Sequence, residues 1–173
     1  LIAWAVLWVA HARALKFAGT SLREHRVYAA VATLALLLLG WLVSSGSIET
    51  WTVVRYFGGR HLPSEATAWQ DPVFGHPLRF YLFDLPFYSM LRRYLLAVAV
   101  VSALLYWAAA RGWQLVRQLP EMKETGQIDP QLFRLEGALE SRFLRGIAAV
   151  VLLAVALQFY LGRYEMLFEN HGF

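Results

Sequence analysis

Three uninterrupted apolar runs constrain the fold of this chain more than any other feature. They cover residues 27–43, 94–110 and 146–162, and none contains Asp, Glu, Lys or Arg. A helix rises about 1.5 Å per residue, so each run covers about 26 Å, and a few flanking residues extend it to the roughly 30 Å hydrocarbon core of a bilayer. Buried helices of a soluble protein would carry polar faces at helical spacing, which runs such as AAVATLALLLLGWLV lack. We therefore predict membrane-spanning helices.

The composition agrees, because 58% of the residues are hydrophobic and 16% are charged. We predict an all-α fold, a polytopic transmembrane helix bundle with interfacial helices in its loops. The expected spans are a truncated one at about 1–14 and three full ones at about 27–45, 87–110 and 145–162. The first residue already lies in an apolar helix and is not Met, so we expect a single membrane module that is part of a longer protein.

Lys and Arg in the connecting loops predict the orientation. Loops 15–26 and 111–144, with their helix ends, hold ten of the sixteen basic residues: Arg13, Lys16, Arg23, Arg26, Arg111, Arg117, Lys123, Arg134, Arg142 and Arg145. The positive-inside rule places these loops in the cytoplasm, and places loop 46–86 and the C-terminal end outside. The net charge of +4 is too small and scattered to indicate a nucleic-acid partner.

The loops carry signals of their own. Residues 47–57 read as a short interfacial helix that Ser47 caps and that Gly58 or Gly59 ends with a positive φ. In the cytoplasmic loop, Asp129 and Pro130 begin an amphipathic helix whose apolar positions are Leu132, Leu135, Leu139 and Phe143. It is suited to the inner membrane surface or, second, to packing on a partner helix.

The segment before the third apolar run holds a turn and a helix start. Asp71 opens a turn that Gly75 closes, and Asp84 is expected to cap the following helix. Arg92 and Arg93 then fall about two turns into that helix. They must extend toward the membrane surface or pair with acids, because an unpaired charge at depth is costly.

Two motifs resemble a bacterial membrane-protein family known as uncharacterised protein family 0182. The first is DPVFGHPLRFYLFDLPF, in which the matching residues are Asp71, Pro72, Phe74, Gly75, Phe80, Tyr81, Phe83, Leu85, Pro86 and Phe87. The second is RYEMLF, with Arg163, Tyr164, Glu165, Leu167 and Phe168. The resemblance implies a module of seven membrane helices followed by a large extracytoplasmic domain, of which this chain matches the second to fifth helices. It implies no biochemical activity.

The candidate sites each have a plainer interpretation. The aromatic residues around Phe83 and Phe87 suit a ligand entrance, but more often form the belt of a membrane interface. Asp71 and Asp84 suit acid-base work less well than turn and cap roles. His61, His76 and His171 share the outer face with acids but lack metal-ligand spacing, so no metal site is predicted.

The spans themselves offer weak candidates. His11 is the one candidate cofactor ligand, for haem or a pigment, against the plainer interpretation of an interfacial His bonded to water or a headgroup. Gln158 suits an interhelical hydrogen bond, and the pairs Ala99 with Ala103 and Ala29 with Thr33 suit close helix packing. No catalytic residue is predicted, since phosphate-binding, nucleophile-elbow and dinucleotide motifs are missing from the sequence.

These observations favour a non-catalytic protein of the bacterial inner membrane. We expect a structural or accessory subunit that packs with other membrane subunits, contacts membrane lipids and needs no cofactor beyond a bound lipid. A second hypothesis is transport or handling of a lipid or other hydrophobic ligand, with the aromatic outer loop as a gate. A third is a pigment-associated subunit that uses His11 or the interfacial Trp residues.

Overall fold

The computed structural model describes residues 1–20, 26–63, 68–125 and 141–166 of the chain. Its helices are α1 (Ile2–Phe17), α2 (Arg26–Ser47), α3 (Thr50–Gly59), the π-helical turn η2 (Phe80–Asp84), α4 (Leu85–Thr125) and α5 (Arg142–Glu165). The described residues form no strand beyond one isolated bridge between Gln70 and Pro77. The predicted all-α helical bundle is confirmed.

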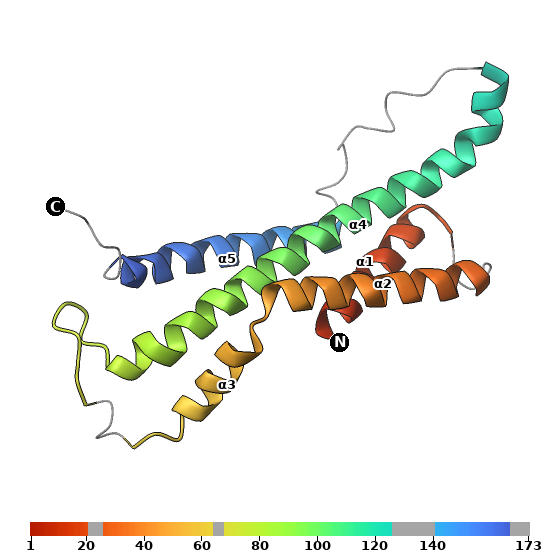
Figure 1. The fold of residues 1–173 in the computed structure, drawn as a ribbon. Helices are drawn as coiled ribbons and strands as arrows, with labels where there is room; N and C mark the ends of the chain where they lie inside the picture. The colour runs from red at the N-terminus through yellow and green to blue at the C-terminus, as the bar shows by residue number, and fades with distance from the viewer. Residues whose placement is uncertain (21–25, 64–67, 126–140, 167–173) are drawn as a thin grey trace, which may run out of the picture.

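Helix α4 is the central element, and α1, α2, α3 and α5 all contact it (Figure 1). Helix α1 runs parallel to α4, since Ala3 packs beside Val98 near one end and Ala14 packs beside Ala110 near the other. Helix α5 runs antiparallel to α4, with Leu161 beside Leu85. We call the end of the bundle that holds Leu85 and Tyr164 the motif end, and the opposite end, which holds Tyr28, the Tyr28 end.

Three helices are long and apolar enough to cross a membrane: Arg26–Ser47, Phe80–Arg117 and Arg142–Glu165. Their outward faces are strongly apolar, with Leu34, Leu152 and Phe159 exposed by 68%, 70% and 78%. Large apolar side chains exposed over most of a helix face are what a lipid or helix environment accommodates. The three predicted full spans therefore correspond to helices compatible with membrane insertion.

Helices α1 and α2 approach most closely at Gly40. A Cβ atom at this position would lie 2.8 Å from the backbone nitrogen of Trp4 and 2.9 Å from its Cα. Only glycine allows two helix backbones to come this near. The predicted small-residue pair of Ala29 and Thr33 forms a hydrogen bond within its own helix, in which the Thr33 hydroxyl donates to the Ala29 carbonyl at 2.7 Å.

The predicted boundaries of the short helix α3 were wrong at both ends. Helix α2 continues through Ser47, so Glu49 and not Ser47 takes the N-cap position, in an extended conformation. At the other end the chain leaves α3 through Arg60 with right-handed backbone angles, and the positive-φ glycines of the described residues are Gly19 and Gly75. Gly59 is needed for another reason: a Cβ there would lie 2.7 Å from Cγ of Phe83.

The prediction that Asp84 caps a helix was also wrong, because the helix begins earlier, with the π-helical turn from Phe80 to Asp84. Pro86 explains the wide turn. It has no N–H to donate to the carbonyl of Leu82 four residues before it, so the regular hydrogen-bond ladder is interrupted. The Leu82 carbonyl instead accepts a hydrogen bond from Nη2 of Arg55 on α3 at 3.3 Å.

Helix α4 extends well beyond the predicted span and reaches Thr125, projecting past the other helices (Figure 1). It therefore takes up the first part of the predicted loop 111–144. Most of the predicted amphipathic helix, including Asp129 and Pro130, lies outside the described residues. Its last apolar position, Phe143, belongs to α5 and stacks on Tyr106 with ring centroids 5.3 Å apart.

Candidate functional site

The two sequence motifs meet at the motif end, with Tyr164 between them. Tyr164 is 1% exposed. Its ring makes edge-on contacts with Phe74, His76 and Phe80, at centroid distances of 5.0, 5.1 and 5.0 Å. Its hydroxyl lies 3.2 Å from Nε2 of His76. A residue of the second motif thus fills the centre of a cluster built by the first, although the two are far apart in the sequence.

Asp71 organises the turn before this cluster. Its carboxylate accepts hydrogen bonds from the backbone amides of Val73 (3.1 Å) and Phe74 (2.8 Å) and from the Tyr81 hydroxyl (2.8 Å). Gly75 closes the turn, as predicted: its N–H donates to the Asp71 carbonyl at 2.8 Å, and its φ is 69°. The turn ties the loop to the buried face of η2, since Tyr81 is itself 7% exposed.

The charge state of Asp71 follows from these contacts. Burial raises the pKa of its carboxyl group, but the two amide hydrogen bonds, the Tyr81 hydroxyl and the charge of His76 outweigh that effect, and the net pKa lies below its usual value. The group is therefore ionised at neutral pH. An acceptor already used by three donors suits the predicted turn role better than proton transfer.

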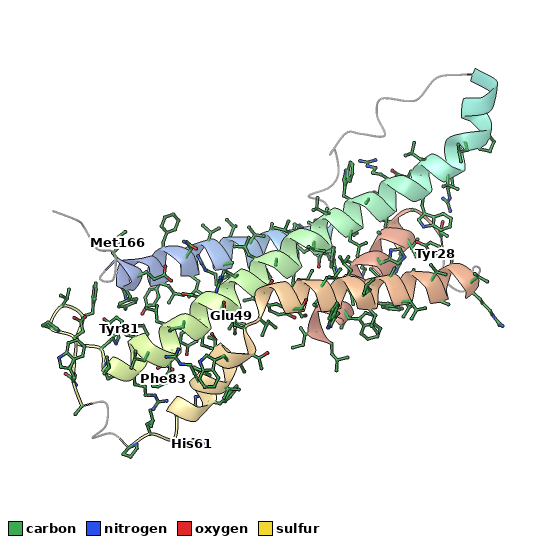
Figure 2. The ribbon with its side chains drawn as sticks, viewed as in Figure 1. Tyr28, Glu49, His61, Tyr81, Phe83 and Met166 are labelled. Atoms are coloured by element: carbon green, nitrogen blue, oxygen red, sulfur yellow. The ribbon has the colours of Figure 1, made fainter. Side chains whose placement is uncertain are left out.

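Other second-motif residues bind the same region. Oγ of Ser89 on α4 donates to Oε1 of Glu165 at 2.7 Å. The Arg163 guanidinium bonds to the Tyr164 hydroxyl and lies 4.2 Å from the Tyr160 ring centroid. The Ser89–Glu165 hydrogen bond connects the end of α5 to the start of α4, and Figure 2 shows Met166, just after α5, at the same end of the bundle as Tyr81. Leu167 and Phe168 of the second motif lie outside the described residues.

Phe83 and Phe87, the proposed gate residues, pack against α3. The Phe87 ring stacks on Tyr56, with centroids 3.8 Å apart and planes inclined by 8°. Phe83 lies against Gly59, and the Arg55 guanidinium lies 5.7 Å from its ring centroid. One side of the first motif thus packs against α5, and another side packs against α3.

His11, the candidate cofactor ligand, lies near the Tyr28 end and is 6% exposed. Its Nε2 is 3.0 Å from the Tyr28 hydroxyl, and Nε1 of Trp113 donates to the same hydroxyl at 3.4 Å. Tyr28 thus joins α1, α2 and α4. The expectation that His11 meets water or a headgroup at a membrane surface was wrong, because the Tyr28 side chain covers it.

The remaining polar candidates are spread along the bundle. Gln158 is exposed and makes no hydrogen bond within the described residues, so the predicted interhelical bond is not formed there. Among the described residues no three His, Cys, Asp or Glu side chains come together as a metal-ion site. His171 lies outside the described residues.

Sequence reasoning identified the motif residues but missed Tyr56, Tyr160, Ser89 and Gly40. Tyr56, Tyr160 and Ser89 carried no motif signal and depend on contacts from distant parts of the chain. A glycine in the middle of an apolar run, as at Gly40, is a signal for close helix approach that could have been used.

Comparison with known proteins agrees with the two motifs. A family model described as Uncharacterised protein family (UPF0182) matches residues 6–173. A UPF0182 protein of Solibacter usitatus is 58% identical over 172 residues, which is 99% of this chain and 19% of that protein. One from Thermosynechococcus vestitus is 32% identical over 59% of this chain and 10% of its own length.

The chain thus spans one fifth or less of the length of these relatives. No solved structure shows significant similarity to it. The family match covers nearly the whole chain, including both motifs whose side chains meet at the motif end, and the chain belongs to the Uncharacterised protein family (UPF0182).

Proposed function

We propose that this chain is a non-catalytic structural module of a bacterial inner-membrane protein. The observation that carries the proposal is the contact between the two motifs around Tyr164. The polar groups around this contact already have partners: Asp71 accepts from two amides and Tyr81, and Glu165 accepts from Ser89. A cluster whose polar groups are already hydrogen-bonded is suited to holding helices in place rather than to chemistry.

The module would hold α3, α4 and α5 in one arrangement and present apolar faces to neighbours. On α2 the side chains of Val31, Leu34, Leu38 and Trp41 are each more than half exposed. Such a face is suited to lipid or to further membrane helices, whether from the longer protein or from another subunit. With the orientation inferred from the loop charges, the motif end lies outside the cytoplasmic membrane, toward the extracytoplasmic domain that the family resemblance implies.

Mass spectrometry of the full-length protein, isolated from its own membranes in mild detergent, tests the proposed subunit role. We expect a membrane-protein companion at fixed stoichiometry, because the exposed apolar faces would pack against its helices. Repeating the isolation from membranes that lack the companion gives the control. A full-length protein that is recovered alone at every detergent concentration would contradict the subunit role.

The competing proposal, a lipid-handling protein with an aromatic gate, makes a different prediction for Phe87. Because Phe87 stacks on Tyr56, we expect Phe87→Ala to loosen α3 from α4 and to accelerate amide hydrogen exchange at residues 50–59. Trp69→Ala, a change at a 56% exposed aromatic side chain before the first motif, is the control and should leave exchange in α3 unchanged. A Phe87→Ala variant with normal exchange but altered binding of a hydrophobic ligand would favour the gate.

A further inference from the structure

Arg92 lies on the side of α4 that packs against α5. It follows Leu85 by two helical turns and so shares its face, and Leu85 packs against Leu161 and Tyr164. Because the two helices are antiparallel, Arg92, two turns after Leu85 on α4, lies level with the turn of α5 that runs from Ala154 to Gln158. Gln158 is one turn from the buried Ala154 and from the buried Leu161, which places it beside the same seam.

The Arg92 guanidinium lacks an anionic partner within the described residues. Its Nε atom is buried and has no hydrogen-bond acceptor there, and the ion pair formed by the described residues belongs to Arg93, which lies 3.8 Å from Glu49. A half-buried guanidinium without an acceptor is costly, and in membrane helices such groups pair with an anion.

The nearby acids do not supply that anion. Glu49 pairs with Arg93 and accepts from Thr52, Asp71 is held by its turn, and Glu165 accepts from Ser89. Asp84 is displaced by about 12 Å along the helix axis from Arg92. The anion that Arg92 requires is therefore a group outside the described residues.

The depth of Arg92 indicates which anion is available. Residues 94–110 are uncharged, with Arg93 before them and Arg111 after them. About 26 Å of apolar helix therefore separates Arg93 from Arg111. Arg92 thus lies next to the outer end of this apolar segment, inside the predicted span 87–110, and its long side chain can extend toward the border of the hydrocarbon core, where phospholipid phosphates begin. The exposed side chains of Leu95, Val155 and Phe159 provide an apolar surface for acyl chains beside it.

We propose that the α4–α5 seam at the motif end binds the headgroup phosphate of an anionic phospholipid, with the Arg92 guanidinium as its charged ligand and the Gln158 amide as a second donor. A guanidinium presents several N–H donors in a plane and suits phosphate oxygens. The site is independent of the proposed structural role, since a lipid bound here leaves the contacts of Tyr164 unchanged.

Native mass spectrometry of the full-length protein, titrated with phosphatidylglycerol after delipidation, tests this site. We expect Arg92→Gln to weaken the tightest binding event about tenfold or more, as the loss of a charged hydrogen-bond partner predicts. Arg93→Gln removes the same charge from the neighbouring, exposed position and should change that affinity by less than about threefold. Arg92→Lys keeps the positive charge but not the planar set of guanidinium N–H donors, and this variant should bind phosphatidylglycerol more tightly than Arg92→Gln.

Three results would overturn the proposal. Equal losses in Arg92→Gln and Arg93→Gln would show a general charge effect, and an unchanged affinity in Arg92→Gln would remove Arg92 from the site. Thermal stabilisation of the delipidated protein by inorganic phosphate alone, abolished in Arg92→Gln, would assign the site to free phosphate and not to a lipid.

Discussion

Replacing Gly40 with Leu is expected to separate α1 from α2 and to lower the free energy of unfolding by about 3 kcal/mol. The reason is that a Cβ at this position would lie 2.8 Å from the backbone nitrogen of Trp4. Backbone atoms cannot move aside as a flexible side chain can, so the helices themselves must part. Equilibrium unfolding of the full-length protein in mixed micelles measures the loss.

Gly46→Leu provides the matched control. Gly46 lies in the same helix, and a Cβ there would meet nothing within 4 Å. The free energy of unfolding of Gly46→Leu should stay within about 1 kcal/mol of the parent, since leucine also favours the helix more than glycine does. If both variants lose the same free energy, the close approach of α1 and α2 at Gly40 is refuted.

Replacing Tyr164 with Ala should be the most damaging change at the motif end, with a loss of about 3–5 kcal/mol. The side chain is 1% exposed and lies among the rings of Phe74, His76 and Phe80. Its removal would leave a cavity between the two motifs. Tyr164→Phe keeps the ring, and we expect it to lose only about 1 kcal/mol, for the hydrogen bonds of the hydroxyl to His76 and Arg163.

Phe159→Ala serves as the comparison for Tyr164→Ala because it removes an aromatic side chain of similar size from the same helix at 78% exposure. Its effect on unfolding should be small. Unfolding in mixed micelles and hydrogen exchange over residues 68–87 would show whether the loss is centred on the first motif. Similar unfolding curves for both alanine variants would argue against a central role for Tyr164.

The interpretation of His11 and His76 depended on packing that no pattern reveals. His11 read as an interfacial residue because it lies near the end of a short apolar run, yet the Tyr28 hydroxyl from the next helix bonds to it, and Trp113 from α4 donates to that same hydroxyl. His76 read as one of several scattered surface histidines. It instead stacks on Phe80 and meets the Tyr164 hydroxyl across the bundle.

The sequence by itself determined the helical class, the three helices long and apolar enough to cross a membrane, and the two motifs, because apolar run length and charge placement are local properties of the chain. Only the tertiary structure decided which residues meet. The Leu82 carbonyl, which Pro86 leaves without its helical donor, accepts a hydrogen bond from Arg55 of α3, and the nearby backbone of Trp4 requires glycine at position 40. Contacts of this kind depend on the register between helices, which side-chain packing along the whole interface selects and which no local pattern encodes.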